Sequence, residues 1–154
     1  RFLPQHLTFK LASSYSGLGA ASAMSIRSLS LKIEHNLEDD DVLGSAAPAD
    51  FLNKQFSIEG TLEATWNNES DFKTAALATT AKAMRIDLVN TDVTIGSAAH
   101  PQIRIDLAKV IFKEITRPIK INDIVRQTLS FKAHYSLSDS LMISALATNV
   151  VASY

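Results

Sequence analysis

The sequence is poor in several residue types, and each shortage weighs against a class of protein. None of the 154 residues is a cysteine, which excludes disulfides, thiolate nucleophiles and thiolate metal sites. Aromatic residues make up 7% of the chain, which does not favour the exposed aromatic platform of a carbohydrate-binding module. No run approaches about 18 uninterrupted apolar residues, so no membrane span is predicted.

The chain also lacks an excess of basic residues. Fifteen Lys and Arg residues stand against 16 Asp and Glu residues, which gives a formal net charge of −1. Proteins that bind nucleic acid by neutralising phosphates usually show a basic excess. No specific binding of DNA is therefore expected.

The length fits one compact β domain over residues 1–154, or the later part of a longer subunit, since the chain does not begin with Met. The apolar start does not read as a secretion signal, because His6, Thr8, Lys10 and Ser13 interrupt it.

The dominant pattern is an alternation of apolar and polar residues, which predicts strands with one buried face. The two longest alternating stretches are 54–66 and 125–137, and shorter ones lie at 7–11, 29–33, 84–88, 103–107 and 141–147. Clean alternation favours antiparallel sheets with one solvated face, in a sandwich or barrel. Phe9, Phe56, Trp66, Phe131 and Tyr135 lie on the apolar side and are expected in the core.

One helix is expected at about 69–82. Asn67, Asn68 and Ser70 offer capping oxygens, and an alanine-rich run without Gly or Pro follows them.

The connection 35–53 is long and carries both acidic and large apolar residues. Its acidic run is Glu38, Asp39, Asp40 and Asp41, and its apolar residues are Val42, Leu43, Phe51 and Leu52. A loop of this kind is expected to fold back on its own domain or to dock on a neighbour. The acidic run suits a solvated loop, a contact with a basic partner or a hard cation, but the spacing of a calcium-binding EF-hand is absent.

Catalytic motifs are absent from the sequence. There is no P-loop, GxGxxG, GxSxG or HExxH, and the four histidines show no ligand spacing. Glu59 and Glu63 on one strand face would be roughly 13 Å apart, wider than an acid/base pair needs. We therefore expect no enzyme activity, no cofactor and no metal site.

The order of these elements resembles the major tail tube proteins of long-tailed bacteriophages. The resemblance covers roughly residues 25–154, and it rests on the strand SLSLKIEHN, the stretch PADFLNKQFSIEGTLEATW, the helical ESDFKTAALATTA, and the strands AMRIDLVN, IRIDLAKVIFKEI and RQTLSFKAHYSL. It implies a mainly β, antiparallel sandwich or barrel-like fold with one flanking helix.

The resemblance also implies a function. In that family six subunits form a ring by joining their inner sheets, and stacked rings form a tube that carries the genome from capsid to host. The resemblance therefore implies a structural protein of the virion that is assembled in the bacterial cytoplasm. Its partners would be copies of itself and terminator, tip or baseplate proteins. DNA would be transiting cargo.

Two surfaces can then be assigned as hypotheses. If the inner sheet uses the two long strands, the polar residues that face the lumen include Glu59, Glu63, Thr128, Ser130 and Lys132. The loop from Glu38 to Asp41, with Val42, Leu43, Phe51 and Leu52, is expected between subunits, with Lys109, Lys113 or Arg117 as candidate basic contacts. The alternative is a β-sandwich binding or adhesion module for a carbohydrate or protein ligand. A small barrel enzyme or lipid carrier lacks a convergent polar set.

Overall fold

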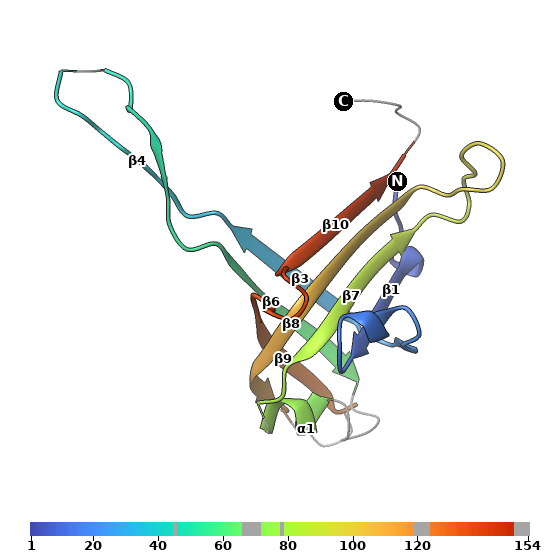
Figure 1. Cartoon of the computed structure of the whole chain (residues 1–154). Helices are drawn as coiled ribbons and strands as arrows, with labels where there is room; N and C mark the ends of the chain where they lie inside the picture. The colour runs from blue at the N-terminus through green and yellow to red at the C-terminus, as the bar shows by residue number, and fades with distance from the viewer. Residues whose placement is uncertain (45, 66–71, 78, 119–123, 150–154) are drawn as a thin grey trace.

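The computed structural model describes residues 1–44, 46–65, 72–77, 79–118 and 124–149, and one antiparallel sheet dominates it (Figure 1). The strands are β1 (Leu7–Ala12), β2 (Ala23–Met24), β3 (Ser28–Glu34), β4 (Leu37–Asp39), β5 (Phe51–Asn53), β6 (Ser57–Thr65), β7 (Lys82–Val89), β8 (Gln102–Thr116), β9 (Arg126–His134) and β10 (Ile143–Thr148). The helical elements are α1 (Phe72–Leu77) and two short 3-10 turns, Pro4–His6 and Ser16–Leu18. The mainly β, antiparallel fold predicted from the sequence is confirmed.

The sheet has the order β2-β1-β7-β8-β9-β6-β3, and β8 is the strand on which it turns. β7 pairs with one edge of β8, while β10 and β9 share the other edge, β10 along 102–107 and β9 along 109–116. β8 therefore belongs to two halves of the sheet, one with β1, β7 and β10 and one with β9, β6 and β3.

The core lies between these two halves. In Figure 1, β3 crosses the direction of β7, β8 and β10. The buried cluster takes side chains from both halves, with Phe9 and Met84 from one and Leu62 and Phe131 from the other. The apolar sides of β6, β7 and β9 are thus buried inside the curled sheet, whereas Ala145 and Ala147 of β10 are exposed.

Two register shifts explain how one strand serves both halves. The pairing with β7 shifts between Lys82 and Met84, and the pairing with β9 shifts between Phe112 and Glu114. Each extra residue reverses which parity faces inward and bends the strand. Alternation therefore predicted a strand at 103–107, whereas the continuous strand runs from Gln102 to Thr116.

The two longest predicted strands are shorter in the structure. Stretch 54–66 forms β6 from Ser57 to Thr65, and Phe51–Asn53 is a separate strand, β5. Stretch 125–137 forms β9, which ends at His134. The expected burial of Tyr135 is wrong, because the chain leaves the sheet there and its side chain is 53% exposed. Trp66 lies outside the described residues.

The predicted helix is present but ends earlier than expected. Thr79 adopts a left-handed conformation (φ 51°), and the Thr80 amide donates to the Ala75 carbonyl (2.9 Å). This six-residue closure is a Schellman C-cap, which terminates a helix. Residues 79–81 are therefore not helical and Lys82 begins β7, while the proposed capping residues Asn67, Asn68 and Ser70 lie outside the described residues. In the part of the chain that is described, no helix is long and apolar enough to span a membrane.

Candidate assembly surfaces

The polar face of β3, β6 and β9 brings together the residues predicted for a lumen. Across β6 and β9, Glu59 is opposite Lys132, Thr61 is opposite Ser130, and Glu63 is opposite Thr128. Lys32, Ser30 and Ser28 continue these three rows onto β3. The structure thus places Glu59, Glu63, Thr128, Ser130 and Lys132 on one continuous face, because strand parity is preserved across an antiparallel register.

The charges on this face are balanced by local pairs. Glu59 accepts from Lys132 (2.9 Å) and Lys113 (3.4 Å), Glu34 pairs with Lys32 (2.7 Å), and Glu63 lies 3.6 Å from Arg126. The three strands carry three carboxylates, Glu34, Glu59 and Glu63, against three cations, Lys32, Arg126 and Lys132. This part of the face therefore has no net charge.

Strand β8 brings a further cation to Glu59. Lys113 follows the buried Phe112, so its ammonium lies on the polar face, and the register shift places Glu114 opposite Ser130 on the same face. Hydrogen bonds from Lys132 and then Lys113 hold the pKa of the Glu59 carboxyl below its ordinary value. Burial, together with Lys132, Lys109 and Lys113, lowers the pKa of His134.

The segment 35–56 forms a long two-stranded arm, which projects away from the body (Figure 1). β4 and β5 pair with each other, with Leu37 opposite Asn53 and Asp39 opposite Phe51, and they do not join the main sheet. Two outcomes were expected from the sequence: the loop would fold back on its own domain, or it would dock on a neighbour. The structure does not show the first, because the arm projects away from its own core (Figure 1).

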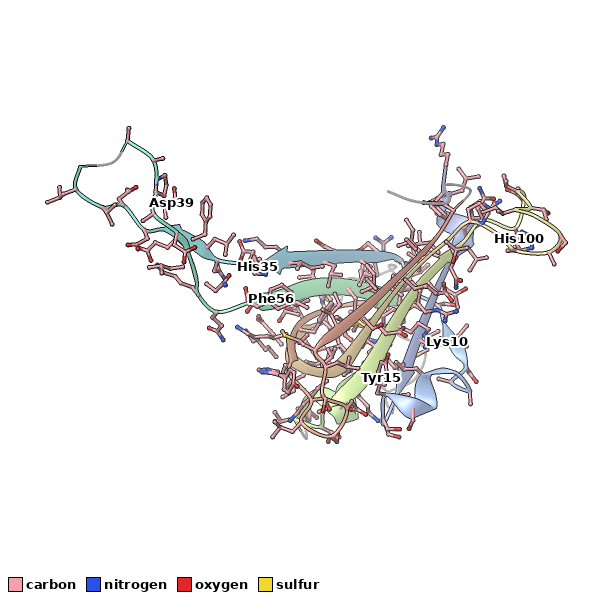
Figure 2. All side chains as sticks on the ribbon, turned by 45° about the horizontal axis from the view of Figure 1, so that its top comes forward. Lys10, Tyr15, His35, Asp39, Phe56 and His100 are labelled. Carbon is pink, nitrogen blue, oxygen red and sulfur yellow. The ribbon has the colours of Figure 1, made fainter. Side chains whose placement is uncertain are left out.

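The chain bends at the base of the arm, where local contacts hold the two strands together. Asn36 adopts a left-handed conformation (φ 46°), which Asn tolerates better than most residues. Its side-chain amide donates to the Gln55 carbonyl (2.6 Å), and the His35 and Phe56 rings meet edge to face 5.4 Å apart (Figure 2). The arm therefore leaves the body through a hydrogen-bonded joint.

The far part of the arm exposes large apolar side chains. Leu43 is fully exposed and Phe51 is 60% exposed. The others on the arm with exposed side chains are Leu37, Val42 and Leu52. An isolated two-stranded ribbon is marginally stable in water at best. The acidic residues Glu38, Asp39 and Asp41 are exposed beside them, and Lys54 pairs with Glu38.

The candidate basic contacts for this acidic run lie in three different surroundings. Lys113 is engaged with Glu59 on the polar face, whereas Lys109 is exposed and lines a surface hollow next to Tyr135. Arg117 is half-buried just beyond β8. The exposed Leu137 and Tyr135 beside Lys109 were missed by the sequence reading, because alternation continues past the point where β9 ends.

The half of the sheet that contains β1, β7, β8 and β10 has a different polar face. Arg85 and Asp106 are paired across β7 and β8 and joined by two hydrogen bonds (2.7 and 2.8 Å), and the neighbouring row pairs Asp87 with Arg104 (3.3 Å). The Asp106 carboxylate beside it raises the pKa of Arg85. Among the described residues, no group of three or more His, Asp or Glu side chains could hold a metal ion.

Comparison with known proteins identifies relatives of this arrangement. The family model described as phage tail tube protein matches residues 4–133. Comparison with curated proteins gives no match.

Three solved structures share the fold at low sequence identity. The PVC sheath-tube complex of an extracellular contractile injection system matches with 12% identity and a TM-score of 0.64, over 96% of this chain and 93% of that one. The tail of an empty GTA particle, refined with C6 symmetry, matches with 12% identity and a TM-score of 0.61, over 97% and 100%. The six-fold symmetrised baseplate of the anti-feeding prophage matches with 14% identity and a TM-score of 0.53, over 94% and 91%.

Proposed function

The chain belongs to the phage tail tube protein family, and from this premise we propose that it assembles into rings that stack to form a tail tube, the conduit for delivery of the phage genome. The role is structural and non-enzymatic. The protein is a component of the phage tail, assembled in the cytoplasm of the host bacterium, and residues 1–154 act as one tail-tube unit.

The observation that carries the proposal is the arm. A ribbon that exposes Leu37, Leu43, Phe51 and Leu52 to water has no structural purpose in a monomer, since exposed apolar patches promote association. Burial of one such side chain in a neighbour stabilises the contact by roughly 1.5–3 kcal/mol. Repeated around a ring, part of that free energy is enough to decide whether rings stack.

Six-fold rings are the proposed stoichiometry. Two structures with the same fold, the GTA tail and the anti-feeding prophage baseplate, are described with C6 and six-fold symmetry. By the same reasoning, terminator and baseplate proteins are proposed as partners at the tube ends, since relatives of this fold occur in a sheath/tube terminator and in a baseplate.

The polar face of β3, β6 and β9 is proposed as the lumen wall. Its side chains are small or charged and its carboxylates are paired with cations, so the wall offers a passing polyanion no net positive field. DNA is then a transiting cargo that the wall does not bind specifically.

Deletion of residues 38–50 tests the role of the arm. The shortened protein should keep the circular dichroism spectrum and thermal transition of a folded β protein, because the arm makes no strand pairing with the main sheet. It should no longer form tubes in electron micrographs. Normal tubes would show that the arm is dispensable, and loss of the folded spectrum would show that it supports its own core.

A further inference from the structure

A surface hollow of about 430 Å³ lies where β7 begins and the loop after β9 leaves the sheet. Lys82 and Lys109 line it together with Tyr135 and Leu137, and Ser13 reaches it from the segment after β1. Leu137 is 88% exposed, so this rim is apolar as well as basic. The proposed lumen wall, by contrast, exposes polar side chains.

The loop that forms one wall of the hollow is held by hydrogen bonds. The Ser136 amide donates to the Leu141 carbonyl (2.9 Å), and the Ser136 hydroxyl donates to Asp139 (2.6 Å). Asp139, the carboxylate that also lines the hollow, is thereby occupied within the loop. The bulge in β8 leaves Lys109 exposed between the buried Ala108 and Val110. Lys82 and Lys109 thus lie beside a hydrogen-bonded loop.

The arm carries the complementary chemistry. Residues 37–53 contain five carboxylates, Glu38, Asp39, Asp40, Asp41 and Asp50, and no Lys or Arg. Val42 and Leu43 follow the acidic run directly, and both are exposed. An acidic and apolar arm tip matches a basic and apolar hollow in both charge and hydrophobicity.

The two surfaces lie far apart on one molecule. In Figure 2, Asp39 lies on the projecting arm, whereas Tyr15, two residues after Ser13, lies in the lower part of the body, away from the arm. A contact between the arm and the hollow would therefore join two copies of the chain. Contact between two different patches is heterologous, and a heterologous contact that does not close generates an open stack.

We propose that the hollow lined by Lys82, Lys109, Tyr135 and Leu137 is the acceptor for the arm of a second copy of this chain, with Asp39 and Asp41 beside the lysines and Leu43 against Tyr135 and Leu137. This inference rests on the proposed function, because it names the surface that the intersubunit arm meets. Docking there covers apolar area on both partners, and the lysines select the acidic arm.

Charge reversal tests the acceptor. The Lys82→Glu/Lys109→Glu variant should raise the protein concentration needed for tube formation by about tenfold or more, since two attractive contacts become repulsive. Adding Asp39→Lys/Asp41→Lys in the same chain should restore assembly. Arg1→Glu is a control for a charge reversal outside the hollow, which Arg1 does not line, and it should assemble like wild type.

The outcomes separate the acceptor from the proposed function. Wild-type tubes that survive Lys82→Glu/Lys109→Glu, but not removal of the arm, would overturn the acceptor and leave the proposed function standing. Loss of assembly without rescue by the arm substitutions would also overturn it. A wild-type chain that stays monomeric at every concentration would overturn both.

Discussion

Gly60 lies directly opposite Phe131 across β6 and β9, and the aromatic ring occupies the space that a side chain at position 60 would need. A Cβ on Gly60 would meet Phe131 Cζ at 2.5 Å and would also meet the Ser30 carbonyl of β3. The glycine thus lets three strands of the proposed lumen wall pack closely while the ring fills the core beneath them. An aromatic residue that covers a cross-strand glycine is a known way to fix strand register.

Gly60→Ala should lower the free energy of unfolding by about 3 kcal/mol, because the Ser30 carbonyl is backbone and cannot move aside easily. Urea denaturation checks this. Gly19→Ala is the matched control, since nothing lies within 4 Å of the added Cβ and its φ of −60° suits alanine. The control should be neutral or slightly stabilising. Equal effects in the two variants would contradict the packing argument.

Alternation of apolar and polar residues predicted most of this fold, because the central strands β6, β7 and β9 each bury one face. The prediction failed where a β-bulge interrupts the two-residue period of a strand. The bulges in β8 reverse parity near Lys109 and at Lys113, so no single alternation spans the 15-residue strand. Alternation also failed to predict the end of β9 at His134. Tyr135 and Leu137 continue the apolar pattern in the sequence, but both side chains are exposed in the structure.

The candidate surfaces were predictable to different degrees. The shared face of Glu59, Glu63, Thr128, Ser130 and Lys132 follows from parity once β6 and β9 are neighbours, and the structure pairs them. The sequence predicted a long loop at 35–53 that folds back on its own domain or docks on a neighbour. Its projection as an arm depends on the left-handed Asn36, which composition alone does not reveal. The hollow depends on a loop and a bulge that are distant in sequence.

The helix end offers a test of backbone strain. Thr79 is β-branched and sits at the left-handed position of the Schellman cap, where glycine is preferred. Thr79→Gly should raise the free energy of unfolding by about 0.5–1 kcal/mol, measured by thermal or urea denaturation. Thr80→Gly, which relieves no left-handed conformation, should be slightly destabilising. A destabilised Thr79→Gly variant would contradict the strain assigned to this position.

The Arg85–Asp106 pair is largely shielded from water, with side chains 16% and 6% exposed. Asp106→Ala leaves a buried guanidinium without its partner and should cost about 3 kcal/mol of stability. The double variant Arg85→Met/Asp106→Leu should recover most of that loss, because two apolar residues replace two charges. Urea midpoints of both variants test this, and additive losses in the double variant would count against it.

Glu59 gives a pH prediction. Its pKa is lowered in the folded state by Lys132 and Lys113, so its contribution to stability is present above its unfolded pKa and is lost as pH falls through the folded one. Wild type should have a higher urea midpoint than Glu59→Gln near pH ~7, and the difference should close on the acid side of pH ~4. If the difference in urea midpoint between wild type and Glu59→Gln stays constant with pH, the ion pairs of Glu59 do not stabilise the fold.

The balanced charges of the proposed lumen wall predict weak contact with DNA. Wild-type protein should show negligible binding to duplex DNA at physiological salt in fluorescence anisotropy, because three carboxylates offset three cations on β3, β6 and β9. Glu59→Lys/Glu63→Lys, which makes this face basic, should bind with a steep salt dependence. Submicromolar binding by wild type with a steep salt dependence would contradict a neutral wall.

Negative-stain electron microscopy of the purified wild-type protein, over a series of concentrations, tests the central claim most directly. The account predicts rings and hollow tubes that appear as concentration rises, since the arm buries its apolar residues only between copies. A dispersed monomer at the highest concentration would contradict it and would favour a binding or adhesion module.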